Sequence, residues 1–166
     1  MELDLHSDTI RTFTGKNLDV FNPDPEMICI EDIAHALAQT PRFAGHLPYF
    51  YSVAHHSVMC AEEVSKIEHA PGDILAALMH DASEAYLTDI PRPIKKRLPE
   101  YKKIEDGLMK VISEKFGFEY PLNNSVKYID DKMLQWEWES LMNGKQQIEF
   151  DAVEQFLFIY DQYKKL

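Results

Sequence analysis

The chain has 166 residues, of which 45% are hydrophobic and 27% are charged, and its formal net charge at pH 7 is −11. A chain of this length forms one domain with one continuous core, and its composition is that of an ordinary globular protein. The acidic balance argues against generic binding to duplex nucleic acid, because it repels the phosphate backbone. A bound cation and a few local basic residues would still permit a small phosphorylated substrate.

Membrane insertion, secretion and a disulfide framework are also unexpected. No apolar run approaches the roughly 18 residues of a membrane span, and the first residues, MELDLHSDTI, lack the basic and apolar segments of a signal peptide. The two cysteines, Cys29 and Cys60, are predicted to be reduced, buried thiols. We therefore expect a cytoplasmic protein without a membrane partner.

The first predicted element is a β-hairpin, and helices follow it. Residues 10–21 suggest two short strands joined by a turn at 14–16. Apolar residues at helical spacing then predict a helix at 31–39 and a second at about 52–67, with Ser52 as the N-cap of the second.

The next predicted helix, at about 73–86, is apolar over most of its circumference, which indicates a buried central position. Three prolines make residues 87–99 largely a loop. The fold class is therefore all-α, a helical bundle with a short N-terminal β-hairpin, in a single domain over 1–166. Three further helices complete it, at about 101–116, 124–143 and 146–164.

Tryptophan and glutamate alternate within the helix predicted at 124–143, in the run Trp136-Glu137-Trp138-Glu139. We interpret this run as structural. The rings are expected to pack at a helix interface while the two acids face water.

The predicted central helix carries the strongest chemical signal, His80-Asp81-Ala82-Ser83-Glu84. Residues three and four apart share a helix face, so Glu84 lies one turn beyond both His80 and Asp81. Unpaired charges in a core are costly, and these side chains need a strong partner, which a divalent cation supplies. Imidazole and carboxylate ligands together favour one transition metal ion such as Mn, Co, Ni, Fe or Zn over calcium.

Further ligands must come from other segments, because two adjacent residues of a helix point about 100° apart. The candidates are His55 or His56 on the preceding helix and Asp130 or Asp131 on a later one. The residues alone do not choose within either pair.

Three separated segments identify a resemblance when they are taken together. They are YSVAHHSV at 51–58, ALMHDASE at 77–84, and Ile129-Asp130. Over about residues 28–140 the chain resembles the HD-domain metal-dependent phosphohydrolases, and within them the small bacterial 5′-deoxynucleotidases and the related phage dNTP phosphohydrolases. The combination is specific, whereas a bare His-Asp dipeptide would mean almost nothing.

The resemblance implies one divalent metal ion held by His56, His80, Asp81 and Asp130. It selects His56 because the first histidine of the family precedes Ser-Val or Ser-Leu. It selects Asp130 because the last aspartate follows Val-Lys and two further residues, although the neighbours of Asp130 differ from the small and basic residues that are usual there.

Two acidic residues are the predicted catalytic groups. Glu84 shares the face of the metal ligands without being needed as one, so it is placed to act as general base toward a water or as acid toward the leaving oxygen. The resemblance implies the same role. A bound cation would lower the pKa of that water toward about 7 and polarise a phosphoryl oxygen. The resemblance also places Asp89 near the sugar or the attacking water, in a segment where Thr88 replaces the usual glycine.

Four residues are predicted to bind the substrate. Arg42 beside Phe43 suits a nucleotide, with the guanidinium on phosphate and the ring on base or sugar, and this pair resembles one in the similar nucleotidases. His46, in the same loop, is a candidate phosphate contact. Lys95 belongs to the one dense basic cluster of the chain, at 92–97, which would attract a polyphosphate.

The predicted activity is metal-dependent hydrolysis of (deoxy)nucleotide phosphates. One site allows two products, inorganic phosphate from a dNMP or triphosphate from a dNTP, and the residues do not choose between them. The alternative is a non-catalytic HD module that binds a nucleotide and signals. Members of the resembled family are commonly oligomeric, so the resemblance also implies a homo-oligomer.

Overall fold

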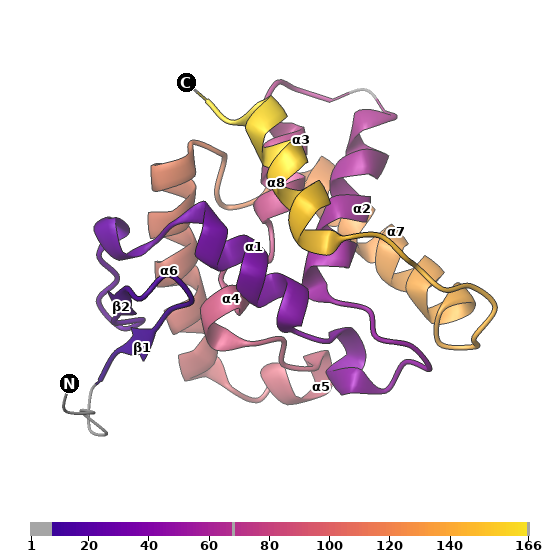
Figure 1. Ribbon diagram of the computed structural model, residues 1–166, viewed down its shortest axis with the longest axis horizontal. Helices are drawn as coiled ribbons and strands as arrows, with labels where there is room; N and C mark the ends of the chain where they lie inside the picture. The colour runs from indigo at the N-terminus through magenta and orange to yellow at the C-terminus, as the bar shows by residue number, and fades with distance from the viewer. Residues whose placement is uncertain (1–7, 68, 166) are drawn as a thin grey trace.

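In the computed structural model, the described residues are 8–67 and 69–165. Most of the N-terminal stretch inspected for a signal peptide, residues 1–7, lies outside them. The predicted fold class is confirmed, because the described residues form an all-α bundle with one two-stranded antiparallel sheet (Figure 1). No helix among them is long and apolar enough to cross a membrane.

The elements follow the predicted order, but the helix predicted at 73–86 is divided and three short helical elements, η1, η2 and α5, are added. In chain order they are β1 (Ile10–Arg11), β2 (Asn17–Leu18), η1 (Pro25–Met27), α1 (Ile30–Gln39), η2 (Arg42–Gly45), α2 (Val53–Ser65), α3 (Asp73–Met79), α4 (Glu84–Leu87), α5 (Arg92–Lys95), α6 (Pro99–Phe116), α7 (Asn124–Ser140) and α8 (Ala152–Tyr163).

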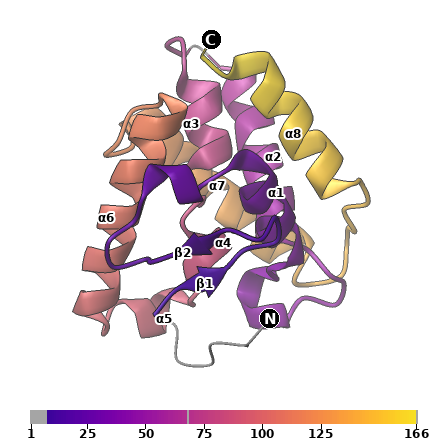
Figure 2. The same ribbon diagram turned by 60° about the vertical axis from the view of Figure 1, so that its left-hand side comes forward.

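The predicted hairpin is formed, and it is joined to the helical body through α1. Ile10 pairs with Leu18, and the Leu18 side chain is fully buried. The backbone N–H and the hydroxyl of Thr14, in the turn, donate to the Asp32 carboxylate of α1 at 2.7 and 2.9 Å. These two bonds hold the turn against α1 (Figure 2).

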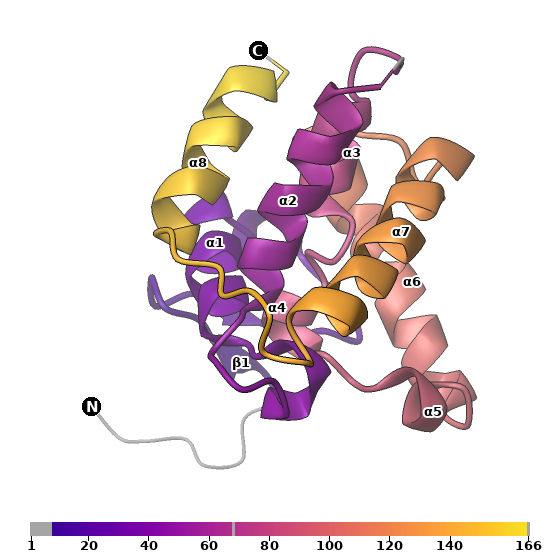
Figure 3. The same cartoon turned by 90° about the vertical axis from the view of Figure 1, so that its right-hand side faces the viewer.

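Helix α2 lies at the centre of the bundle and packs against α3, α7 and α8. Figure 3 shows α2 between α7 on one side and α8 on the other. Its N-terminus is fixed by the predicted cap, because the Ser52 hydroxyl accepts the His55 N–H at 3.1 Å while His55 Nδ1 accepts the Ser52 N–H at 3.2 Å. This reciprocal arrangement is a capping box in which histidine takes the usual place of glutamate. The cap sets the register that carries His56 toward α3 and α7.

The prediction of one continuous helix at 73–86 is wrong, because α3 ends at Met79 and α4 begins at Glu84. In the intervening turn the Ala82 N–H donates to the Met79 carbonyl at 3.0 Å, and the Glu84 N–H donates to the Asp81 carbonyl at 2.9 Å. Such i to i−3 hydrogen bonds tighten a helix locally. The backbone angles stay close to helical values, so the apolar pattern continues through the turn and does not reveal it.

The predicted loop at 87–99 also contains a single helical turn, α5. Pro93 occupies its first turn, a position that proline tolerates because the missing N–H would have no helical partner there. The three last predicted helices are present as α6, α7 and α8, with α7 ending and α8 beginning several residues inside the predicted bounds.

Candidate metal centre

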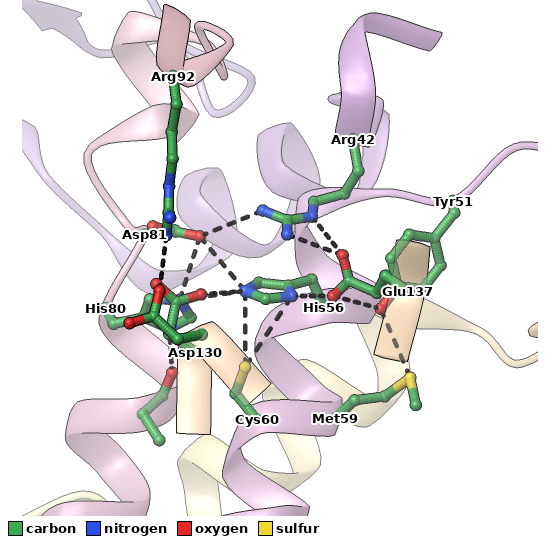
Figure 4. Close-up of polar contacts among 12 residues, drawn as sticks. Arg42, Tyr51, His56, Met59, Cys60, His80, Asp81, Arg92, Asp130 and Glu137 are labelled. Atoms are coloured by element: carbon green, nitrogen blue, oxygen red, sulfur yellow. Dashed lines mark hydrogen bonds and ion pairs between the residues drawn. The ribbon is translucent and has the colours of Figure 1, made fainter. Parts of the chain in front are cut away.

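Side chains from α2, α7 and the turn after α3 converge at one point inside the bundle. His56, Cys60, His80 and Asp130 form a mostly buried group that could hold a metal ion, with one ligand atom from each lying within 4.8 Å of the others. Asp81 reaches the same point with its Oδ2 atom (Figure 4). The structure therefore brings together all four residues that the sequence predicted as ligands.

The spacing of these atoms suits coordination of a single ion. His56 Nε2 lies 3.2 Å from His80 Nε2 and 3.0 Å from Asp130 Oδ1. His80 Nε2 lies 3.4 Å from Asp130 Oδ1 and 3.2 Å from Asp81 Oδ2, and Asp81 Oδ2 is 3.8 Å from His56 Nε2. Nitrogen and oxygen atoms bound at about 2.0–2.2 Å to one ion lie roughly 2.8–3.6 Å apart. Four of the five separations fall in that range and the fifth is close to it.

Each histidine directs its Nε2 lone pair toward this point because its Nδ1 is hydrogen-bonded elsewhere. His56 Nδ1 donates to the Glu137 carboxylate, and His80 Nδ1 donates to the Ala77 carbonyl at 2.6 Å. A hydrogen bond at one ring nitrogen fixes the tautomer that leaves the other free as a ligand. The donor set of two imidazole nitrogens and two carboxylates therefore fits a divalent cation.

Cys60 was predicted as a buried thiol, and it is buried, but its position beside His56 was not predicted. Its Sγ lies 3.5 Å from His56 Nε2 and 4.0 Å from Nδ1. These similar distances place the sulfur against the flank of the ring and off the axis of the Nε2 lone pair. The four-residue spacing of His56 and Cys60, which places both on one helix face, was the sequence signal that could have predicted this contact. Cys29, the other predicted buried thiol, is only half-buried and contacts Asp32.

The two residues that the sequence left as alternatives have other partners. His55 is engaged at both ring nitrogens, by Ser52 in the cap and by the Phe150 carbonyl at 3.0 Å. Asp131 is exposed and accepts a hydrogen bond from Arg92 at 2.9 Å. The structure thus places His56 and Asp130, and not their neighbours, in the cluster.

The cluster strongly attracts positive charge. Burial works against ionised imidazole, yet nearby acidic groups hold the pKa values of His56 and His80 well above the ordinary 6.5. Burial also works against ionised carboxylate, yet His80 lowers the pKa of Asp81 to about 2. The pKa of Asp130 is likewise depressed, despite its burial, by His80 and His56. Protons on the imidazoles or a bound cation can supply the charge that the carboxylates require.

The interpretation of Glu137 as an acid facing water is wrong. Its side chain is fully buried, whereas Trp138 is 58% exposed. Arg42 donates to Glu137 Oε2 from Nε at 3.1 Å and from Nη2 at 2.8 Å, and the Tyr51 hydroxyl donates to Oε1 at 3.4 Å. Seven residues separate Glu137 from Asp130, which is two helical turns, so both lie on the same face of α7. That spacing was the signal available in the sequence.

A cavity of about 730 Å³ opens beside the cluster. Glu84 lies in its wall, buried, and its Oε2 atom has no hydrogen-bond partner among the described residues. Burial and then the charges of Asp81 and Asp89 raise the pKa of Glu84 well above 4.5. Burial, more than any neighbouring charge, also raises the pKa of Asp89. The main lining residues are Arg42, Phe43, Asp81, Glu84, Asp89, Arg92, Lys95, Asp130, Leu134 and Trp138.

Three of the four predicted substrate residues line this cavity, and one does not. Arg42 and Phe43 lie at its wall, and Lys95 also lines it while its Nζ donates to Glu105 at 2.5 Å. His46 is exposed and is not among the lining residues. The position of His46 close to Arg42 in the sequence does not bring it to the cavity, because the turn between the two residues directs the chain away from the cavity wall.

The backbone at Phe43 is strained. Phe43 and Ala44 have φ values of +55° and +52°, in the left-handed region that residues with a side chain rarely adopt. Such strain costs of order 1–3 kcal/mol per residue and persists where surrounding contacts over-determine it, often at ligand-binding positions. Here it positions the Phe43 ring 6.3 Å from the Trp138 ring, between centroids, at the edge of the cavity.

Two curated proteins are similar to this chain over most of its length. The uncharacterized Escherichia coli protein YfdR is 46% identical over 132 residues, which cover 80% of this chain and 71% of that protein. An uncharacterized Rhodobacter capsulatus protein is 34% identical over 152 residues, which cover 86% of this chain and 77% of that protein. No protein-family model matches the chain.

Proposed function

We propose that this chain, which belongs to the same family as Escherichia coli YfdR, is an HD-domain, metal-dependent phosphohydrolase that acts on deoxynucleotide phosphates. One observation carries the proposal. The Nε2 atoms of His56 and His80 and the carboxylates of Asp81 and Asp130 converge beside a cavity whose wall contains the buried acid Glu84. A candidate metal site next to a buried acid supports metal-assisted hydrolysis of a phosphate ester with general acid–base catalysis.

The proposed cofactor is one divalent transition metal ion per chain, from among Mn, Co, Zn, Ni and Fe. His56, His80, Asp81 and Asp130 would hold it, because mixed imidazole and carboxylate ligands suit these ions. When bound, the ion would supply Lewis-acid chemistry toward a phosphoryl oxygen.

The two acids in the cavity wall would handle the protons of hydrolysis. Attack by water on phosphorus releases one proton, and departure of the ester or anhydride oxygen takes one up. Glu84, with its raised pKa, is suited to donate a proton to the leaving oxygen as the P–O bond breaks. Asp89, in the same wall, is suited to accept the proton of the attacking water.

The proposed substrate class follows from the walls of the cavity. Its volume of about 730 Å³ lies within the range of small-molecule sites. Arg42, Arg92 and Lys95 provide positive charge for phosphate on an otherwise acidic chain. The rings of Phe43 and Trp138 offer an apolar surface for a base at the edge of the cavity.

Phosphate release from a panel of nucleotides tests the proposal. Protein loaded with Mn²⁺ or Co²⁺ is incubated with each dNMP and dNTP, and the products are separated to distinguish inorganic phosphate from triphosphate. We expect release that is abolished by EDTA and restored by metal. If metal-loaded protein binds nucleotides but releases phosphate from none, the non-catalytic HD module is the better description.

A further inference from the structure

The imidazole of His56 is held at both nitrogens by carboxylates from one helix. Asp130 of α7 contacts Nε2 at 3.0 Å, and Glu137, two turns further along α7, accepts the Nδ1–H. The His56 ring itself is fully buried. The two acids cannot have equal roles, because Asp130 lines the cavity and Glu137 does not.

Glu137 is also the residue that holds Arg42. Its Oε2 accepts two hydrogen bonds from the Arg42 guanidinium, at 3.1 and 2.8 Å, while its Oε1 accepts from His56 and, at 3.4 Å, from Tyr51. Both carboxylate oxygens are therefore fully used in a site that water does not reach. A buried carboxylate with complete partners in fixed directions is rigid, and so are the groups that it holds.

We infer that Glu137 is a positioning residue that holds the metal ligand His56 and the cavity guanidinium of Arg42 in register with each other. Its Oε1 fixes the His56 tautomer that presents Nε2 toward the cluster, and a carboxylate at Nδ1 also makes Nε2 a stronger ligand. Its Oε2 binds Nε and Nη2 of Arg42, which leaves Nη1 directed toward Asp81 at 4.0 Å. The Glu137 side chain, which lies outside the cavity, thereby fixes the orientation of a metal ligand and the position of a positive charge at the cavity. The Arg42 part of this inference rests on the proposed function, whereas the His56 part requires only that the site binds metal.

A purely structural ion pair is the competing explanation. Arg42 and Glu137 would then be a buried pair that stabilises the packing of η2 against α7, and His56 would be an incidental third partner. The two explanations differ in one respect. If the pair is only structural, loss of the Glu137 charge lowers the stability of the fold and nothing more. If Glu137 is a positioning residue, exchanging the acceptor that faces His56 for a donor also lowers the affinity of the site for metal.

Glu137→Gln makes that distinction because it keeps the shape of the side chain. An amide has one acceptor oxygen, and if that oxygen faces Arg42 the NH₂ group faces His56 Nδ1. The His56 proton then moves to Nε2, and in this tautomer Nε2 has no lone pair with which to bind metal. The matched control is Glu139→Gln, two residues away on the same helix, whose exposed carboxylate is hydrogen-bonded only to Gln135 among the described residues.

The test is Co²⁺ affinity of the metal-free full-length variants, measured by calorimetry without substrate, together with their melting temperatures. We expect Glu137→Gln to bind Co²⁺ about 10- to 100-fold more weakly than the parent and Glu139→Gln to match it. A folded Glu137→Gln protein whose affinity lies within twofold of the parent would overturn the inference. Affinity is measured without turnover, so this result is independent of whether any nucleotide is hydrolysed.

If Glu137→Gln does not fold, a second measurement tests which nitrogen of His56 binds the metal. In ¹⁵N-histidine-labelled parent protein loaded with Zn²⁺, His56 should show a protonated Nδ1 and a metal-bound Nε2, with His56→Ala used to assign its signals. Metal bound at Nδ1 of His56 would be incompatible with Glu137 in the role assigned to it.

Discussion

Asp130 and Glu137 lie seven residues apart on α7 and contact opposite nitrogens of the same imidazole, that of His56. One helix thus contributes both a candidate metal ligand and the group that orients a second ligand. The geometry depends on α7 remaining regular between the two residues and on α2 packing directly against it.

His80→Ala should remove metal binding. The variant loses one of two imidazole ligands and removes a positive partner that Asp81 and Asp130 share. We expect less than a tenth of the parental metal content after reconstitution, measured by elemental analysis. His69→Ala is the control, because that histidine is exposed and, among the described residues, is hydrogen-bonded only to the nearby Ile67 carbonyl. Equal metal content in the two variants would contradict the assignment.

Glu84→Gln should keep the metal but lose turnover. The amide preserves the shape of the side chain and removes the transferable proton, so kcat should fall by about 10²–10⁴-fold while metal content stays parental. Because burial and nearby acids raise the pKa of Glu84, its ionisation destabilises the fold at high pH, and the variant should melt no lower than the parent at pH 8. Glu62→Gln, at an exposed site on α2, serves as control. Parental kcat in Glu84→Gln would refute its role in proton transfer.

Stability of the metal-free protein should fall as pH rises above neutrality. The folded pKa values of His56 and His80 are raised above 6.5, so their contribution is fully present below about pH 6.5 and is lost as pH rises through the folded values. Urea unfolding of EDTA-treated protein at pH values from about 6 to about 9 measures this directly. Saturating metal should flatten the dependence, because the cation replaces the lost protons. A metal-free protein that gains stability over this range would contradict the electrostatic description of the cluster.

Arg42→Met should destabilise the fold far more than Arg92→Met. Arg42 is buried, and its loss leaves the buried Glu137 carboxylate with His56 as its remaining partner that can carry charge. Breaking a buried ion pair in this way costs about 3–5 kcal/mol. Arg92 pairs with Asp131 at the surface, where such pairs contribute at most about 1 kcal/mol. Denaturant midpoints of the two variants provide the comparison. Similar midpoints would show that Arg42 is not the principal counter-charge of Glu137.

The candidate ligands could be predicted because charged residues stand out in an apolar segment. His80, Asp81 and Glu84 interrupt a run whose other members are nearly all apolar, and that contrast does not depend on the exact backbone. The choice of His56 over His55 came from the resemblance alone. Its physical reason is the capping box at Ser52, which engages the His55 ring and turns the next residue inward.

Glu137 was missed because the two residues after it in the sequence are exposed, and its seven-residue spacing from Asp130 is informative only once Asp130 is known to face the cluster. Helical periodicity places Trp138 and Glu139 on exposed faces, and an acid between two tryptophans gives no local sign of burial. Glu137 can be buried because Arg42, which is 95 residues away along the chain, neutralises its carboxylate. The division of the central helix was also invisible, since the tightened turn at 80–83 preserves the apolar pattern on either side.

The most direct test of the account is anomalous X-ray diffraction from crystals of the protein loaded with Mn²⁺ or Co²⁺. We predict one anomalous peak per chain, within about 2.0–2.3 Å of His56 Nε2, His80 Nε2 and carboxylate oxygens of Asp81 and Asp130. A peak bound elsewhere, or fully loaded crystals with no peak among these four side chains, would contradict the metal centre and the function proposed from it.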